Sequence, residues 1–356
     1  MDENNQKQDT EKKIKAATII YSLVIAVAAY LIIMGAFIYG FGAKNKITEA
    51  TAKYFPYPAA VVNYKSFVTA SELNNNLQSV KRFYESQDFS QAGMRVDFST
   101  EDGRKRLKMK EGQLLNKMIE DKAVEILARQ SGIKITAEDV QQNVKRKLDE
   151  YGTGDSVKEN LSKLYGWTLS DFEEKIVKPG LYGEELEKLI VSQNKNDFIA
   201  SAKEKIEKAK NELENKKDFS EAAKIYSDGS TAGEGGELGW FKKDQLISEV
   251  SQAAFSLKKG QRSDIIESVL GYHIIELEDK KTENSEELVK IRQIFARKKN
   301  FADWLDGKIK EMKIYIPLKD YYWNKENGTA EFSSEEMKEF EKSIMENFQG
   351  DASVIF

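Results

Sequence analysis

The chain has 356 residues, of which 40% are hydrophobic, so it is long enough for two domains with separate cores. Its formal net charge of -4 at pH 7 argues against a nucleic-acid-binding protein, which would carry a basic surface. It contains no cysteine and a single histidine, which excludes disulfides and thiol nucleophiles and leaves almost no means of building a zinc site. We therefore expect no metal, no cofactor and no nucleic-acid partner.

Residues 16–43 form an uninterrupted apolar segment. These 28 positions carry no charge, whereas a helix needs about 20 residues to cross a bilayer. Lysines flank the segment and bias the N-terminus slightly towards the cytoplasm: Lys12, Lys13 and Lys15 before it, Lys44 and Lys46 after it. We predict a transmembrane signal anchor that holds the chain in the lipid bilayer, with residues 1–15 cytoplasmic and the bulk of the chain outside the cytoplasm. A cleaved signal peptide would have a shorter apolar core, and a buried globular helix would show a polar face.

A linker is predicted at residues 44–55, followed by a strand, a turn and a helix. Pro56 and Pro58 bar helix formation and favour an extended chain. Residues 59–62 and 67–69 are predicted as two short strands, and Ser71 is predicted to cap the helix that follows.

Residues 104–190 have the apolar spacing of helices. Thr136 with Asp139 predicts a capping box at the start of a helix. The segment from Gly166 to Phe172 predicts the end of one helix and the capped start of the next. Together with the preceding strands, this order resembles the N-terminal domain of SurA-like and PrsA-like foldases. The resemblance implies a mainly helical chaperone domain at residues 56–199.

Residues 226–277 combine a glycine-rich turn, an apolar helix and the histidine. They contain Y-S-D, G-G-E-L-G-W-F, a helix ending in A-A-F, and G-Y-H-I-I, in that order. The segment resembles the parvulin (PpiC, or rotamase) family of peptidyl-prolyl cis-trans isomerases. The resemblance implies a parvulin-like domain at residues 200–300, with a four-stranded antiparallel sheet and helices, and thus an α+β fold class for the chain.

The family's first strand, which bears a histidine, is missing before this segment. Residues 288–297 alternate apolar and polar side chains with period two and resemble that strand, with Gln293 at the histidine position. We predict a permuted domain in which this strand pairs antiparallel with residues 271–277 through a polar loop at 279–287. The alternative is that residues 288–296 begin a separate element.

The last part of the chain is predicted to hold a helix at 301–312, short strands around the turn-prone residues 324–328, and a helix at 333–348. We expect residues 301–356 to pack back on the chaperone domain. A partner-docking helix is the alternative for the tail.

The resemblance to parvulins also implies the site residues. Leu238, Leu246 and Val250 would line a proline pocket backed by Phe241 and Phe255, while His273 and Gln293 would be the catalytic pair. Three positions depart from the family pattern: Val250 replaces a phenylalanine, Gln293 a histidine, and Gly229 a polar residue. A core histidine that merely bonds its neighbours is the alternative for His273.

Two functions therefore stay open. The first is a membrane-anchored peptidyl-prolyl isomerase that assists the folding of exported proteins and acts on their X-Pro bonds, which isomerise slowly unaided. The second is a non-catalytic holdase that binds unfolded, proline-containing segments. A Ser-His-Asp hydrolase is disfavoured because no G-x-S-x-G motif occurs, and residues 233–239 match neither nucleotide-binding glycine motif.

Overall fold

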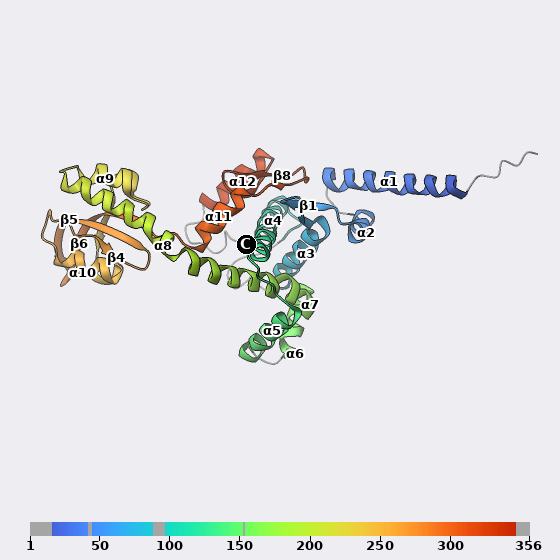
Figure 1. Ribbon diagram of the computed structural model, residues 1–356, viewed down its shortest axis with the longest axis horizontal. Coiled ribbons are helices and arrows are strands. Elements are labelled where there is room, and N and C mark those ends of the chain that lie inside the picture. The colour runs from blue at the N-terminus through green and yellow to red at the C-terminus, as the bar shows by residue number, and fades with distance from the viewer. Residues whose placement is uncertain (1–15, 42–44, 88–96, 152–153, 347–356) are drawn as a thin grey trace, which may run out of the picture. The chain divides into compact units, whose positions relative to one another are not determined.

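A computed structural model describes residues 16–41, 45–87, 97–151 and 154–346. The chain forms two compact units: unit 1 comprises residues 1–183 and 309–356, and unit 2 comprises residues 184–308. Helix α8 (Lys178–Glu214) begins in unit 1 and ends in unit 2, and α11 (Phe301–Glu311) leads back (Figure 1). Unit 2 thus interrupts unit 1 in the sequence, and it encloses the predicted 200–300 segment.

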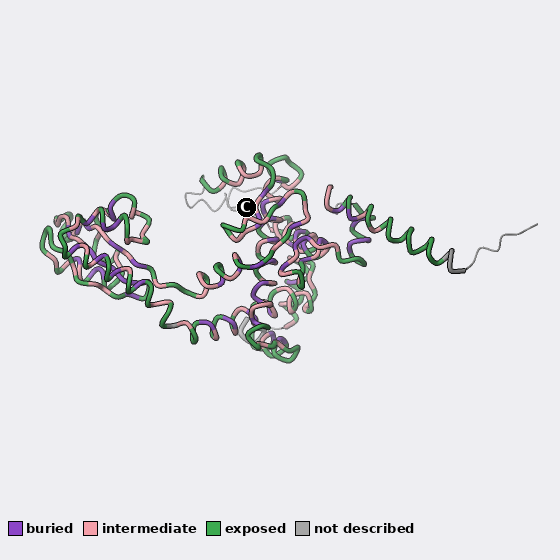
Figure 2. Tube along the Cα trace, turned by 45° about the horizontal axis from the view of Figure 1, so that its top comes forward, coloured by how far each residue is buried: buried purple, intermediate pink, exposed green. Residues whose placement is uncertain are grey.

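Unit 1 opens with the apolar helix α1 (Ala16–Phe41), which is followed by α2 (Lys46–Tyr54). Strands β1 (Pro58–Val62) and β2 (Ser66–Thr69) pair antiparallel, and then come α3 (Ala70–Ser86) and α4 (Glu101–Gln130). Helix α4 buries Leu115, Ile119 and Ala123 completely or almost so, and the four-residue spacing places them on one face. Purple segments in Figure 2 mark such buried stretches, whereas residues 20–30 of α1 are exposed.

A group of shorter helices completes the middle of unit 1. It comprises α5 (Ala137–Tyr151), α6 (Gly154–Asn160), α7 (Leu169–Phe172) and the π-helical turns Leu161–Tyr165 and Glu173–Val177. The predicted capping box is confirmed, since the Asp139 carboxylate accepts hydrogen bonds from the backbone and hydroxyl of Thr136. Trp167 donates its indole N–H to Ser79 Oγ at 2.7 Å, which ties this group to α3.

The C-terminal segment returns to unit 1. Strand β7 (Ile314–Tyr315) pairs with β1, and β8 (Tyr321–Asn324) and β9 (Thr329–Phe332) form a separate ribbon before α12 (Glu335–Glu346). The side chain of Asn116 on α4 makes both backbone hydrogen bonds that a neighbouring strand would otherwise make to Ala330. It accepts from Ala330 N at 2.6 Å and donates to Ala330 O at 3.0 Å. The last ten residues, which include Phe348 of the predicted tail helix, lie outside the described ranges.

Unit 2 is built around a four-stranded antiparallel sheet. The strands are β3 (Glu237–Phe241), β4 (Ile266–Glu267), β5 (Gly271–Glu283) and β6 (Glu286–Arg297), in the spatial order β3-β6-β5-β4. Side chains alternate between the two faces. One face packs on α8 and α9 (Phe219–Tyr226), and the other packs on α10 (Ser248–Ser256).

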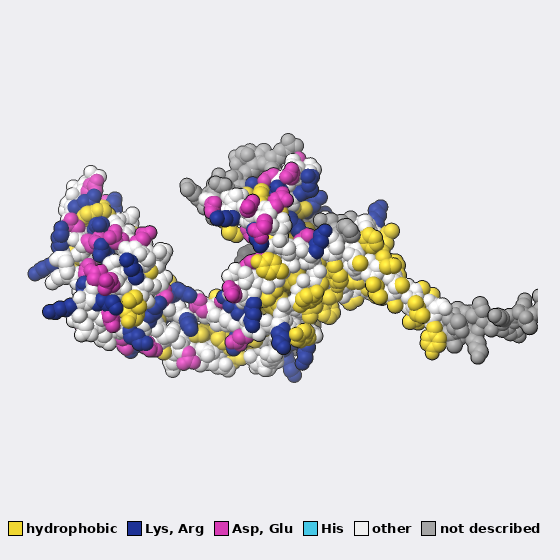
Figure 3. Space-filling view, turned by 90° about the horizontal axis from the view of Figure 1, so that it is seen from above, with side chains coloured by type: hydrophobic (Ala, Val, Ile, Leu, Met, Phe, Trp, Pro, Cys, Tyr) yellow, Lys and Arg dark blue, Asp and Glu magenta, His cyan; other side chains and the backbone are white. Residues whose placement is uncertain are grey.

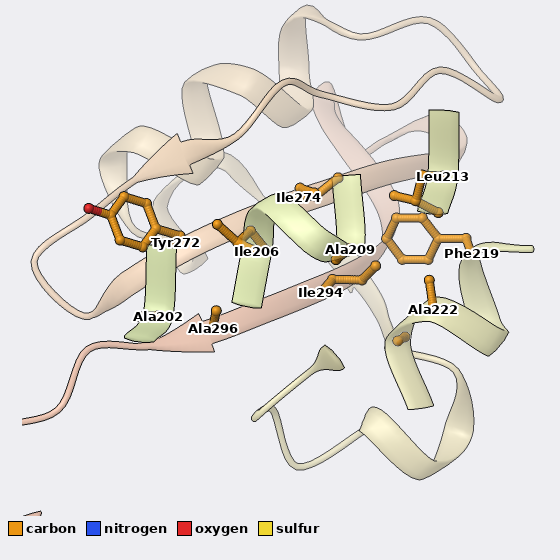
Figure 4. Close-up of a cluster of buried hydrophobic side chains, with 11 residues drawn as sticks. Ala202, Ile206, Ala209, Leu213, Phe219, Ala222, Tyr272, Ile274, Ile294 and Ala296 are labelled. Carbon is orange, nitrogen blue, oxygen red and sulfur yellow. The ribbon is translucent and has the colours of Figure 1, made fainter. Parts of the chain in front are cut away.

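Figure 4 shows the α8–α9 side of this sheet, where small residues let the helix approach closely. Ala202, Ile206 and Ala209 of α8 lie over Ile274 of β5 and Ile294 of β6. All five side chains are at most 2% exposed. The burial of Ile294 in this layer stabilises β6 in its place between β3 and β5.

Three local predictions need correction. Thr69, not Ser71, caps α3, because Glu72 lies three residues after it and completes a reciprocal capping box. Residues 46–54, predicted as linker, form α2. The predicted polar loop at 279–287 is mostly strand, and the hairpin turns at Asn284 and Ser285, whose φ angles of 49° and 65° suit a two-residue hairpin turn.

Candidate active site

The α10 face, meaning the sheet face that α10 covers, carries every residue predicted for the site. Ile275 and Leu277 of β5 and Val289 and Ile291 of β6 form its buried floor. The five predicted pocket residues all pack against this floor: Leu238, Phe241, Leu246, Val250 and Phe255. The predicted substrate-binding residues are therefore brought together.

The pocket residues differ in how far they are covered. Val250 is 1% exposed and belongs to the floor, whereas Leu238, Phe241, Leu246 and Phe255 are half-buried. Next to them, Ile247, which precedes α10, is 38% exposed. The α10 face thus has a solvent-accessible apolar surface above a fully buried apolar floor.

His273 lies on the same face of β5 and is 3% exposed. Its ring stacks on Phe295 with the centroids 4.7 Å apart, and its Nε2 lies 2.7 Å from Ser268 Oγ. Burial lowers the pKa of His273 below its usual value; Gln293 and Glu249 oppose this shift. The imidazole is therefore neutral near pH 7.

The strand register shows where the predicted histidine–glutamine pair lies. Phe295 stands directly opposite His273, and Gln293 stands opposite Ile275, so Gln293 is a diagonal neighbour on the same face. The Gln293 amide is near enough to affect the His273 pKa, yet within the described part of the chain Nδ1 has no hydrogen-bond partner. The two residues thus lie on the same face of the sheet, with the Gln293 amide beside the imidazole.

Two residues beside His273 were not predicted. Ser268 forms a tight turn, in which its Oγ accepts from the backbone N–H groups of Leu270 and Gly271, both at 3.2 Å. Phe295 comes from β6. The sequence offered a weak signal for Ser268, since a serine three residues before a glycine often closes a turn, but its contact with the imidazole depends on the tertiary fold.

The glycine turn holds β6 in place. Gly236 has a φ of +79°, and its carbonyl accepts from Gln293 N at 2.8 Å. A Cβ there would lie 2.4 Å from Gln293 O, so the close approach requires glycine. Further along, Ser227 Oγ accepts from Phe295 N, and Asp228 accepts from Arg297 N. The serine and aspartate of the Y-S-D motif thus accept hydrogen bonds from backbone N–H groups of β6 in the part of that strand that β3 does not reach.

These groups suit binding and positioning better than bond cleavage. The face combines an apolar surface, a neutral imidazole and a hydroxyl, and the position after Y-S-D is Gly229, which has no side chain to offer. Among the described residues there is no cluster of three or more side chains that could ligate a metal ion. Rotation about an X-Pro bond breaks no covalent bond, so it needs no nucleophile or metal ion, and a surface with these groups can favour it.

Two parts of the chain match known family models. Residues 178–279 match the PPIC-type PPIase domain, and residues 15–176 match the SurA-like N-terminal domain. Strand β6 lies beyond the first of these matches. Both domain types agree with the α+β fold class predicted from the sequence.

Individual relatives are similar over shorter stretches. The foldase protein PrsA of Geobacillus kaustophilus is 37% identical over 109 residues, which is 29% of this chain and 39% of that protein. The chaperone SurA of Hydrogenovibrio crunogenus is 38% identical over 86 residues, 24% of this chain and 19% of that protein. A crystal structure of the PrsA peptidylprolyl isomerase from Bacillus anthracis matches 54% of this chain and 83% of its own, at 22% identity and a TM-score of 0.20. The chain thus spans well under half the length of the two curated relatives.

Proposed function

We propose that this chain, which carries a PPIC-type PPIase domain behind a SurA-like N-terminal domain, is a membrane-anchored foldase. It acts outside the cytoplasm as a peptidyl-prolyl isomerase on unfolded or exported polypeptides. The observation that carries the proposal is the α10 face, on which five apolar side chains, a neutral histidine and the inner strands of the sheet come together.

The proposed mechanism follows from what the twisted amide needs. The planar X-Pro amide is stabilised by resonance and by water around its polarised carbonyl, which sustains a barrier of about 18–20 kcal/mol. The half-buried Leu238, Leu246 and Phe241 bind the proline ring and exclude water from one side of the bond. An amide that is less well solvated twists more easily, so catalysis comes from favouring the twisted state over the planar one.

His273 has a positioning role in this proposal. Its ring is held between Ser268 and Phe295, and it forms a rigid wall beside the apolar surface. Because its pKa is lowered, it presents no positive charge that would attract water to the site. Gln293 supplies the nearby amide that can hydrogen-bond to the substrate backbone.

We further infer that β6 replaces the first strand of the parvulin fold, so that the domain is permuted. In support, β6 lies between β3 and β5, whereas the family match ends at residue 279, before β6 begins. The segment before α9, where the family pattern has its first strand, is the helix α8. The hairpin turn at Asn284 and Ser285 makes the connection short.

The membrane location rests on α1. Residues 20–40 are long and apolar enough to cross a bilayer, and 11% of that stretch is buried within the protein. The length and apolar composition of α1 support an anchor in the membrane. The orientation, with residues 1–15 cytoplasmic, rests on the flanking lysines.

A non-catalytic holdase is the second candidate, and a specific observation favours it. Val250 is fully covered and small, so the pocket loses the dispersion contacts that a phenylalanine would provide, and Gly229 adds no polar group. An isomerisation assay with a proline peptide separates the two functions. Acceleration that falls in Leu246→Ala supports the isomerase, whereas binding of unfolded chains without acceleration supports the holdase.

A further inference from the structure

The second half of α1 is attached to unit 1 by specific contacts. Tyr57 donates its hydroxyl to the carbonyl of Leu31 at 2.7 Å, and the hydroxyls of Tyr30 and Thr51 lie 2.6 Å apart. The Tyr57 ring also lies against Gly35, where an added Cβ would be 3.2 Å from the ring. Helix α1 is therefore not a flexible connection to unit 1, because α2 and Tyr57 contact it from Tyr30 onwards.

The part of α1 before these contacts is too short to cross a bilayer alone. Residues 16–30 span about 22 Å at 1.5 Å per residue, whereas the hydrocarbon layer is about 30 Å thick. Lys15 precedes them and cannot extend the apolar stretch. A complete crossing must therefore include several residues beyond Tyr30, and those residues carry α2 with them.

The free side of α1 in this region supports the same placement. Ile32, Ile33 and Phe37 are 73%, 51% and 45% exposed, while Gly35 and Ile38 on the opposite side are buried against the protein. The exposed apolar surface thus continues past the point where α2 makes contact. Figure 3 shows hydrophobic side chains extending from α1 onto the adjoining part of unit 1.

Helix α2 itself has one apolar side that no other element of the described ranges covers. Thr48, Thr51 and Ala52 are buried, and Lys46, Glu49 and Lys53 line a cavity shared with α3. Ile47 and Tyr54, here called the α2 stripe, lie seven residues apart and therefore share the remaining side of the helix. Ile47 and Tyr54 are 64% and 77% exposed, so the stripe presents apolar surface to its surroundings.

We propose that the α2 stripe lies in the leaflet of the bilayer that faces unit 1. The occupant of this surface is lipid, because α1, held against α2, continues the same apolar surface into the membrane. The lysines beside the stripe have side chains long enough to reach the headgroups. This inference rests on the proposed membrane span of α1, and it implies that unit 1 is held against the membrane surface rather than suspended from it.

Single-cysteine labelling tests this arrangement in the full chain, which has no cysteine of its own. Spin-labelled variants are reconstituted into phosphatidylcholine–phosphatidylglycerol vesicles, and collision with oxygen, which favours lipid, is compared with collision with a water-soluble nickel chelate. The test positions are Ile47→Cys and Tyr54→Cys, with Glu49→Cys as the matched control on the opposite side of α2. Val24→Cys reports on the anchor, and Val269→Cys, at a site 89% exposed in unit 2, reports on water.

The expected result is that Ile47→Cys and Tyr54→Cys behave like Val24→Cys, with more oxygen than nickel collisions, while Glu49→Cys behaves like Val269→Cys. If both stripe positions match Val269→Cys while Val24→Cys still reports lipid, the anchor stands and the inference is overturned. If Val24→Cys also reports water, the membrane span itself is wrong and the inference falls with it. Neither outcome bears on the isomerase activity of unit 2.

Discussion

Replacing Gly236 with alanine tests whether β6 is held by the glycine turn. Gly236 has a φ of +79°, and its carbonyl accepts a hydrogen bond from Gln293 N. The new Cβ would lie 2.4 Å from the Gln293 carbonyl oxygen and 3.2 Å from the Ala223 Cβ. The first of these is a backbone atom of a buried inner strand, so the chain must shift to relieve the contact.

The expected cost of Gly236→Ala has three sources. Left-handed backbone costs a residue with a Cβ about 1–2 kcal/mol, and loss of the Gln293 hydrogen bond costs about 0.5–1.5 kcal/mol. Forcing the strand away from its packed position adds about 1–3 kcal/mol. We therefore expect the unfolding free energy of unit 2 to fall by about 3–6 kcal/mol, a large part of the 5–15 kcal/mol typical of a domain.

Gly239→Ala is the matched control. Gly239 has a φ of +88°, but a Cβ there would meet no atom within 4 Å, so only the backbone cost of about 1–2 kcal/mol applies. Hydrogen exchange of the β5 and β6 amides in increasing urea reports on unit 2 separately from unit 1. Equal losses in the two variants would refute the reasoning, because the difference depends on β6 lying against Gly236.

Three further outcomes are expected. The pKa of His273 is lower in the folded chain than in the unfolded chain, so as the pH falls the unfolded chain is protonated first. Unit 2 should therefore keep its full stability above pH 6.5. Below that pH its unfolding free energy should fall by up to about 1.4 kcal/mol per pH unit, until the lowered pKa is reached. Urea unfolding at pH 5–8 should show this loss in the parent chain and a weaker one in His273→Gln; identical pH profiles would contradict it. Ser268→Ala removes the hydroxyl that caps the turn and bonds Nε2, so unit 2 should lose about 1–3 kcal/mol and the imidazole NMR signals should shift; unchanged signals would exclude the Ser268 contact. Asn116→Ala leaves the N–H and C=O of Ala330 without the Asn116 side chain as partner and should raise hydrogen exchange in β8–β9 selectively. Asn211→Ala, at an exposed position of α8, is a control that should leave the ribbon unchanged; equal effects of the two variants would contradict this role of Asn116.

Local patterns in the sequence predicted much of the fold. The period-two alternation of residues 288–297 predicted a strand that pairs antiparallel with residues 271–277, and this pairing is observed. The capping box at Thr136 and the two strands before α3 follow from equally local rules. These features could be predicted because each depends on residues close together in the sequence.

Features that depend on register or on short elements were missed. Phe295, which was not predicted for the site, stands opposite His273, because a two-residue turn and an irregularity between Leu277 and Asp279 set the register. Helix α2 has nine residues, too few for a clear periodic signal, although Asn45 followed by Thr48 forms a capping box. The contact of Ser268 with the imidazole depends on the turn that brings them together, and no spacing rule gives it.

The most direct test of the central claim is an isomerisation assay of the full chain, reconstituted in lipid, with a peptide whose X-Pro bond starts in the cis form. The parent should accelerate isomerisation above the spontaneous rate, and Leu246→Ala should lower kcat/KM roughly 10-fold or more, since its truncation removes about 2 kcal/mol or more of apolar contact at the proline ring. Ile225→Ala, which changes an exposed side chain on α9, should leave the rate unchanged. No acceleration by the parent, or equal activity of Leu246→Ala and the parent, would contradict the assignment of an isomerase site to the α10 face.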